Sequence, residues 1–398
     1  MNKKTILLAI CLTIGTMASA VTPHRAKIPN IPGYTTLKGD FHIHTIFSDD
    51  TTWPTTRVDE AVYDGLDFIS ITDHLDTRHQ KMVNNGTFSS EKVNRNTSYE
   101  IAAAQGKKRD VMVIHGAEIT RGKWMFPAHF NAHFITDANE VCAKTESAPK
   151  GKNDIQEEEN AIVAGLKSAR AQGGFLVWTH PDWERQAHNE TLWWPIHSYI
   201  YDNALMDGIE IVNRFTGYDP EAFHWAMEKN LAIVSGTDCH KPMFELVDYE
   251  RGEYRPMTLV FAKERSLKGI REALDARRTA VFCDGHIYGK AELIEALFRE
   301  CFEISDIKYT EKKVSFKIKN NSSIPLVLTK APGSEKVVYP RLVYINEGEE
   351  IDFSINGENN SAPIGLPEFD VNFYVQNFEC DVDTPIKVTY HFAFPKGK

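Results

Sequence analysis

Short apolar runs rich in β-branched residues alternate with longer amphipathic segments from residue 37 to about residue 285. Apolar runs of this length predict buried strands, and apolar positions three and four apart predict helices. The predicted strands are residues 37–44, 67–72, 111–119, 129–135, 175–179, 208–212, 232–236, 257–261 and 279–282. The predicted helices are residues 56–66, 90–105, 153–171, 221–230 and 266–277. Strands spaced by helices predict a parallel α/β sheet or barrel.

The pattern changes after about residue 290. Residues 291–302 predict a linking helix, and the runs beyond it alternate apolar and polar residues between Asn, Gly, Pro and Ser turns. These runs are residues 313–319, 326–329, 337–344, 351–355, 371–376 and 386–394. Such alternation predicts a small all-β sandwich. The expected division is a barrel over 37–288, a linker helix over 289–302 and the sandwich over 303–398.

The N-terminus has the three parts of a secretory signal. Lys3 and Lys4 form a basic start, residues 5–17 are mostly apolar, and Ala18-Ser-Ala20 is a cleavage site. A membrane anchor is the alternative, although the apolar run is shorter than a span requires. We therefore expect cleavage after Ala20, no transmembrane segment afterwards, and a periplasmic or secreted protein. Residues 21–36 are Pro-rich and predict an extended arm.

Composition and charge narrow the class of protein. Of the 398 residues, 42% are hydrophobic and 25% are charged, which is ordinary for a globular protein with a large core. The formal net charge of −10 argues against a nucleic-acid-binding surface, but it allows a small anionic substrate held by metal ions. No cysteine pair has the CxxC spacing, so a zinc knuckle and a dithiol redox motif are excluded.

Histidines and carboxylates follow one predicted strand after another. Residues i and i+2 of a strand point to the same face, so His42 with His44, and Asp238 with His240, can each serve one centre. Similar clusters are Thr72-Asp-His74, Gly116-Ala-Glu118, His129-Phe-Asn-Ala-His133 and Thr179-His-Pro181. Imidazoles and carboxylates at several strand ends predict a multinuclear site for zinc, manganese or iron.

The order of these motifs resembles the PHP (polymerase and histidinol phosphatase) superfamily over residues 37–285, in an exported two-domain form with a C-terminal β domain. The resemblance implies a distorted, TIM-like (β/α)7 barrel with a centre of usually three metals at the C-terminal ends of its strands. The ligands that it implies are His42, His44, Asp49, His74, Glu118, His129, His180, Asp238 and His240.

Two assignments within that set have alternatives. Asp50 competes with Asp49 because the chain has two consecutive aspartates, and His133 competes with His129 because both lie on one strand face. Asp73 is interpreted as a residue that orients a ligating histidine rather than as a ligand.

The reaction that fits such a site is hydrolysis of a small phosphomonoester or phosphodiester by a metal-activated hydroxide. His180 or His240 would protonate the leaving alkoxide if it is not fully engaged as a ligand. Arg214 is the first candidate to hold the non-bridging oxygens. The alternatives to it are Arg121, Lys123 and Lys241.

Five tryptophans lie around the loops that follow the strands, where they either pack the barrel or stack on a sugar or base ring of the substrate. They are Trp124, Trp178, Trp183, Trp193 and Trp194, and Trp193-Trp194-Pro195 is the first candidate for the rim of the site. Residues 141–160 are polar and highly charged, and they predict either a lid at the mouth of the site or a plain solvated loop.

Two other classes of protein stay open. One is an amidohydrolase-like barrel that hydrolyses C–N bonds, although no candidate lysine ligand follows a strand at the expected place. The other is a non-catalytic exported protein that binds glycan through the β domain. That domain has no cluster with ligand spacing, so its expected roles are capping the barrel, forming a homodimer or binding glycan.

Overall fold

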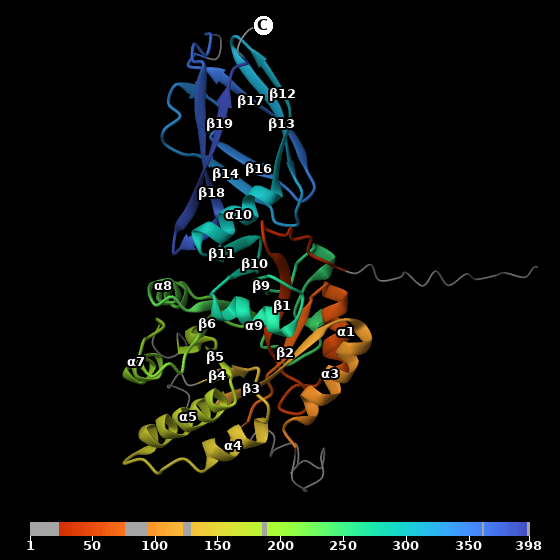
Figure 1. The fold of residues 1–398 in the computed structure, drawn as a ribbon, viewed down its shortest axis with the longest axis vertical. Coiled ribbons are helices and arrows are strands. Elements are labelled where there is room, and N and C mark those ends of the chain that lie inside the picture. Colours follow the sequence, from red (N-terminus) through yellow and green to blue (C-terminus); the bar gives the residue numbers. More distant parts are fainter. Residues whose placement is uncertain (1–23, 76–93, 122–128, 185–188, 360–361, 396–398) are drawn as a thin grey trace, which may run out of the picture.

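The computed structural model describes residues 24–75, 94–121, 129–184, 189–359 and 362–395 (Figure 1). The predicted signal, residues 1–20, and the first residues of the predicted arm lie outside these ranges. Within them, no helix is long and apolar enough to cross a membrane. The arm runs without regular structure up to Tyr34, and Lys27 and Ser323 exchange hydrogen bonds through backbone and side chain.

Seven strands form a ring in the first part of the chain. In spatial order they are β1 (Thr35–Ile43), β2 (Phe68–Ile71), β3 (Met112–Thr120), β4 (His129–His133), β5 (Phe175–Trp178), β6 (Gly208–Asn213) and β8 (Ala232–Gly236). All neighbours are parallel except β4, which is antiparallel to both β3 and β5. Between β8 and β1 the ladder is reduced to one bridge, Ile43 with Cys239, and one hydrogen bond of 2.8 Å from Asp238 N–H to His42 O. The strand and helix pattern predicts a parallel α/β sheet or barrel, and this ring agrees with the distorted (β/α)7 barrel that the family resemblance implies.

Helices cover the outside of the ring (Figure 1). They are α1 (Pro54–Asp64), α3 (Thr97–Arg109), α4 (Ala138–Glu146), α5 (Asp154–Ala171), α7 (Pro195–Asp202), α8 (Pro220–Glu228) and α9 (Leu267–Asp275). Residues with suitable backbone preferences stand at the ends of these helices. Pro54 is the first residue of α1, and Gly65 ends this helix in a left-handed conformation with φ of 69°. Asn153 caps α5 by accepting a hydrogen bond from Gln156 N–H.

Residues 141–160 form neither of the two structures expected from the sequence, a lid or a plain solvated loop. The segment consists of the end of α4, a short connection and the start of α5, and Val141 and Cys142 are buried. Except for Lys150 and Lys152 in the connection, its charged residues lie on helices whose other faces pack on the barrel, so the polar pattern is mainly that of two half-exposed helices.

The sheet continues from the barrel into the C-terminal part. β9 (Met257–Ala262) is antiparallel to β1, and β10 (Thr279–Cys283) and β11 (His286–Gly289) follow it. β11 then pairs in parallel with β18 (Glu368–Asp381) of the C-terminal part, where Ile287 lies opposite Phe378. A short strand, β7 (Gly217–Tyr218), pairs with β6.

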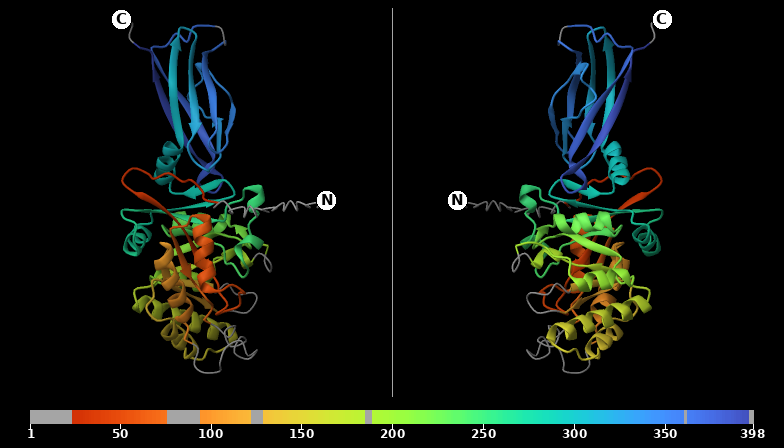
Figure 2. Two further views of the ribbon diagram at one scale, coloured as in Figure 1. Left: turned by 90° about the vertical axis from the view of Figure 1, so that its right-hand side faces the viewer. Right: turned by 90° about the vertical axis from the view of Figure 1, so that its left-hand side faces the viewer.

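The C-terminal part is an all-β sandwich that stands on the barrel, with α10 (Ala291–Cys301) between the two (Figures 1 and 2). One sheet contains β12 (Phe302–Thr310), β13 (Lys313–Asn320), β17 (Glu350–Gly357) and β15 (Val337–Val338). The other contains β16 (Leu342–Ile345), β14 (Leu326–Lys330), β18 and β19 (Thr384–Ala393). The predicted strand 337–344 is thus two strands in different sheets, because Pro340 lies between them and cannot donate to a ladder.

One apolar core connects the two parts. Ile287 of the barrel side, Leu297 and Phe298 of α10, and Phe378 of β18 belong to the same cluster of buried side chains. The sandwich is therefore docked by a shared core and a shared sheet rather than tethered by a linker.

Candidate metal centre

The nine side chains implied as ligands meet at one end of the ring. His42 lies at the end of β1, Glu118 on β3 and His129 on β4, and the others follow strands directly or lie in the loop after β1. They form four overlapping groups in which all ligand atoms of a group lie within 4.8 Å of one another. The groups are His44, Asp49, His74 and His240; His42, His44 and Glu118; His42, His180 and Asp238; and Glu118, His129 and His180.

Glu118 lies at the middle of the cluster. Its Oε1 is 2.7 Å from His129 Nδ1 and 3.5 Å from His180 Nε2, and its Oε2 is 3.4 Å from His44 Nε2. The imidazoles of His42 and His44 also converge, with 3.2 Å between their Nε2 atoms, as their spacing of two along a strand predicts.

Carboxylates close the cluster on its other sides. Asp238 Oδ1 lies 2.9 Å from His44 Nε2 and 3.3 Å from His42 Nε2. Asp49 Oδ1 lies 3.1 Å from His240 Nε2, and this pair is the more exposed part of the set, with side chains 32% and 27% exposed.

The donor set fits divalent transition metals. Glu118 is fully buried, and its Oε2 lies 2.7 Å from His74 Nδ1 and 3.4 Å from His44 Nε2 without a hydrogen bond of good geometry to either. A buried carboxylate oxygen surrounded by imidazoles in this way is stabilised when a cation lies between them. Imidazole nitrogens and carboxylate oxygens that converge from several sides are the ligands that zinc, manganese and iron use.

The buried groups change one another's pKa. Burial opposes the charged form of Asp238, but the imidazoles of His42 and His44 outweigh it and hold the pKa of Asp238 well below its usual range. Burial and two neighbouring imidazoles lower the pKa of His44 well below its usual range. Asp238 is therefore anionic and His44 neutral, which are the forms in which both bind metals.

Two of the candidate ligands have a strained backbone. His180 has a φ of 30° and Asp238 a φ of 49°, in the left-handed region that residues with a Cβ rarely adopt. Hydrogen bonds hold both: His180 N–H donates to Glu210 Oε2 at 2.8 Å, and Asp238 N–H donates to the His42 carbonyl. Strain of this kind concentrates at functional sites, where the surroundings compensate for it.

Glu210 is the residue that sequence reasoning missed. It lies in β6, is buried, and its Oε2 is 3.3 Å from His42 Nδ1, the ring nitrogen that faces away from His44. Asn213 also contacts it, with 3.4 Å from Nδ2 to Oε2. A charged residue in the middle of the apolar run Gly208–Val212 is the signal that could have found it.

The geometry favours one member of each alternative pair. Asp50 is buried against the guanidinium of Arg57, whereas Asp49 faces the histidines. His133 Nδ1 lies 2.8 Å from Ser70 Oγ, outside the four groups, whereas His129 contacts Glu118.

Asp73 orients a histidine only through an intermediate residue. Its carboxylate accepts hydrogen bonds of 2.7 Å from Thr45 N–H, from the Thr45 hydroxyl and from the Ser48 hydroxyl. Ser48 Oγ is in turn 3.4 Å from His44 Nδ1.

A cavity of about 370 Å³ opens over the cluster. Its lining consists of Asp49, His74, His129, His180, Trp183, Phe215, Asp238 and His240. Among the tryptophans, only Trp183 is in this lining; Trp178 is fully buried, Trp193 packs against Trp178 and Trp225, and Trp124 lies outside the described residues. Trp193 and Trp194 therefore do not form the rim that was expected of them.

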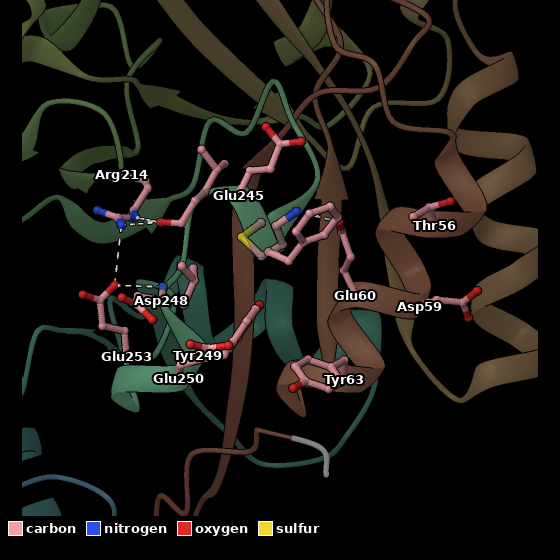
Figure 3. Close-up of a pocket in the computed structure, with 14 residues that line it drawn as sticks. Thr56, Asp59, Glu60, Tyr63, Arg214, Glu245, Asp248, Tyr249, Glu250 and Glu253 are labelled. Carbon is pink, nitrogen blue, oxygen red and sulfur yellow. Dashed lines mark hydrogen bonds and ion pairs between the residues drawn. The ribbon is translucent and has the colours of Figure 1, made fainter. Parts of the chain in front are cut away.

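Arg214 does not face this cavity. Its guanidinium donates to the carbonyl of Leu246 and lies 3.7 Å from Glu253, in a second cavity of about 910 Å³ (Figure 3). The expected contact of Arg214 with phosphate does not follow from this position, because these partners turn its side chain away from the histidines. Arg121 and Lys241 are also absent from the lining that the structure describes, and Lys123 lies outside the described residues.

The chain matches a family model in its C-terminal part and a solved structure over almost its whole length. A family model for an Ig-like domain, DUF5001, matches residues 303–391. The fold is similar to a solved two-domain protein from Bacteroides vulgatus that contains a predicted PHP-like metal-dependent phosphoesterase, with 37% identity, a TM-score of 0.81, and coverage of 92% of this chain and 98% of that one.

Two other solved structures are more distant. A protein from Bifidobacterium adolescentis assigned as a metal-dependent phosphoesterase has 19% identity and a TM-score of 0.36, over 51% of this chain and 87% of that one. An amidohydrolase from Chromobacterium violaceum with bound sulfate and no metal has 16% identity and a TM-score of 0.37, over 62% of this chain and 97% of that one. No curated protein matches the chain.

Proposed function

The chain belongs to the two-domain proteins with a PHP-like metal-dependent phosphoesterase domain, and we propose that it hydrolyses a small phosphomonoester or phosphodiester at the metal centre. The observation that carries the proposal is the convergence of nine histidine, aspartate and glutamate side chains beneath one open cavity. These groups come from strand ends all around the ring, which is where barrel enzymes place their catalytic residues.

Three divalent ions, of zinc, manganese or iron, suit the way in which the ligand groups overlap. Three of the four groups together contain all nine side chains and share only His180. They are the group of His44, Asp49, His74 and His240, the group of His42, His180 and Asp238, and the group of Glu118, His129 and His180. The fourth group takes one member from each of these three: His44, His42 and Glu118. It therefore marks the point where three neighbouring sites meet.

Bound ions of this kind polarise phosphoryl oxygens and make water a stronger nucleophile at neutral pH. The chain's own residues orient and enclose the reacting group. His240 Nδ1 lies 2.7 Å from the carbonyl of Asp238, so this nitrogen carries the proton and Nε2 is directed toward Asp49. His180 and His240 both line the cavity, and we propose as proton donor to the leaving oxygen whichever of the two is not engaged as a ligand. In His240, the more exposed of the two, that proton would be carried by Nε2, since Nδ1 is bound to the Asp238 carbonyl.

Export from the cytoplasm and self-association are further parts of the proposal. The signal-like residues 1–20 support export, and intact mass of the secreted protein should correspond to a chain that begins at Val21. If the sandwich forms a homodimer, light scattering should give twice the mass of one chain. Removal of residues 303–398 is not a suitable control, because the sandwich shares its apolar core with the barrel.

The test of the function is release of phosphate and alcohol from a panel of phosphomonoesters and phosphodiesters. Protein loaded with manganese or zinc is compared with a His42→Ala/His240→Ala double variant and with His391→Ala, a matched control on the sandwich strand β19. We expect release by the parent and by His391→Ala only. If the metal-loaded parent releases nothing from any ester, phosphoester hydrolysis is wrong, and C–N substrates become the next panel.

A further inference from the structure

Two aromatic side chains that are not candidate ligands line the cavity over the metal centre. They are Trp183 and Phe215, residues that are 42% and 49% exposed, and every other lining residue is a candidate ligand. Large apolar rings that stay in contact with water beside a catalytic cavity mark a surface that a ligand covers.

Trp183 is fixed close to the centre by its place in the chain. It lies in the short helix η1 (Pro181–Glu184), directly after His180, and its N–H donates to the His180 carbonyl at 3.1 Å. Its ring centroid is 5.1 Å from that of His180 and 6.4 Å from that of His129. Trp183 therefore stands on the β4–β5 side of the cluster.

Phe215 is fixed on a different side. It follows β6, and its N–H donates at 2.9 Å to Asn213 Oδ1, while the amide of Asn213 donates at 3.3 Å to Asp238 Oδ2. The ring of Phe215 lies 5.9 Å from that of His240, beyond β8. The backbone of Trp183 is thus hydrogen-bonded to His180, and that of Phe215 is connected through Asn213 to Asp238, so both side chains leave the main chain at fixed points beside the metal centre.

The other residues that line the cavity restrict which substrate groups can be bound above the metal centre. In the part of the chain that the structure describes, the cavity wall offers no charged side chain other than the candidate ligands. A phosphate held at the centre would project its alcohol part outward past the two rings, where apolar and flat groups gain most from contact.

We propose that the alcohol part of the substrate carries an aromatic ring, which packs against Trp183 and Phe215. The inference rests on the proposed phosphoesterase function and names the class of ester that the site selects. Trp183 and Phe215 are then specificity-determining residues, and the metal ligands act on the phosphate alone.

The first experiment compares three monoesters of primary alcohols with similar leaving groups: 2-phenylethyl, 2-cyclohexylethyl and n-propyl phosphate, together with their methyl diesters. With metal-loaded protein we expect kcat/KM for the phenylethyl ester to exceed that for the propyl ester at least about tenfold, which corresponds to about 1.4 kcal/mol. The cyclohexylethyl ester should fall clearly below the phenylethyl ester, because it has the size but not the flat π face. Equal rates for the cyclic pair, or no preference over propyl, would overturn the proposal.

The second experiment asks whether these two rings cause the preference. In the Trp183→Ala/Phe215→Ala variant the ratio of kcat/KM between phenylethyl and propyl esters should fall to near one, whereas Trp183→Phe should keep part of it. Phe244→Ala is the matched control, since Phe244 is 72% exposed but lines the other cavity, and it should keep the full ratio. Metal content and melting temperature are measured for every variant, and an unchanged ratio in the double variant contradicts the assignment.

Equilibrium binding separates this inference from the proposed function. The affinity of the metal-loaded protein for 3-phenylpropylphosphonate and for n-butylphosphonate is measured by calorimetry, which needs no turnover. Tighter binding of the phenyl compound that is lost in the double variant supports the aromatic site even if no ester is hydrolysed. Equal affinities for the two phosphonates sink the inference even if the protein is a phosphoesterase.

Discussion

Glu210 connects several parts of the metal centre through one buried carboxylate. Its Oε2 lies 3.3 Å from His42 Nδ1 and accepts the backbone N–H of His180, the residue with a φ of 30°. Gly236 makes room for it, because a Cβ at that position would lie 2.2 Å from Glu210 Oε1 and 2.2 Å from the Cβ of His42. A carboxylate behind a ligating imidazole fixes its tautomer and raises its basicity.

Replacement of Glu210 should therefore weaken metal binding without removing a ligand. We expect Glu210→Gln to lower metal affinity by roughly 10–100-fold. The measurement is competition with a chromophoric chelator, and Glu311→Gln, an exposed change in the sandwich, is the control. Affinity equal to that of the parent would show that Glu210 only fills space.

The histidine and carboxylate positions could be predicted because each lies on a recognisable strand or in the segment that follows one. A spacing of two fixes the side on which His42 and His44 lie, and the structure brings their Nε2 atoms within 3.2 Å. Arg214 could not be placed in the same way, since the carbonyl that binds it belongs to Leu246, 32 residues further along the chain. The direction of a long side chain on a loop depends on such tertiary contacts rather than on local pattern.

Asp219, the residue that caps the N-terminus of helix α8, has a raised pKa. Asp219 accepts hydrogen bonds from Ala222 N–H at 3.1 Å and from the Thr191 hydroxyl at 3.0 Å, and it is buried. Burial, with a contribution from the charge of Asp182, raises the pKa of Asp219 to about 7. The folded protein therefore holds this proton more tightly than the unfolded chain does.

The raised pKa of Asp219 makes the free energy of unfolding depend on pH. The contribution of Asp219 to the free energy of unfolding is fully present below pH 4 and decreases as the pH rises toward 7, at most by about 1.4 kcal/mol per pH unit. Asp219→Asn keeps an acceptor for Ala222 N–H but cannot ionise, so its stability relative to the parent should be greater at pH 8 than at pH 5. Urea unfolding of both metal-loaded proteins at the two pH values measures this difference, and parallel pH profiles would contradict it.

Regular apolar patterns predicted most strands and helices, and the exceptions have identifiable causes. The linking helix 291–302 agrees with α10, and 232–236 agrees with β8. β12 was missed because Glu303, Ile307 and Lys308 are among its polar or exposed positions at the edge of a sheet, where no clear alternation is imposed. The helical character of residues 138–146 was hidden by their charge.

The barrel and the sandwich share one sheet and one apolar core, so they should unfold together. β11 and β18 pair across the boundary, and α10 packs its buried face on both sides of it. Cooperative units of this kind do not melt as separate domains.

Metal removal should consequently lower the melting temperature of the entire molecule. We expect a chelator to abolish ester hydrolysis and to shift a single calorimetric transition downward, with recovery of both when manganese or zinc is restored. Two transitions, of which only one responds to metal, would show that the sandwich unfolds independently. A transition that does not move on chelation would contradict the proposed centre.

The pairing of Lys27 with Ser323 has a consequence for the order of events during biosynthesis. These residues are 296 positions apart, and their hydrogen bonds join the start of the chain to the sandwich. A ribosome-bound chain that stops short of Ser323 lacks this connection, and it also lacks β18, which continues the barrel sheet. The native structure is therefore completed only after nearly the whole polypeptide has been made, because both connections need residues beyond position 320.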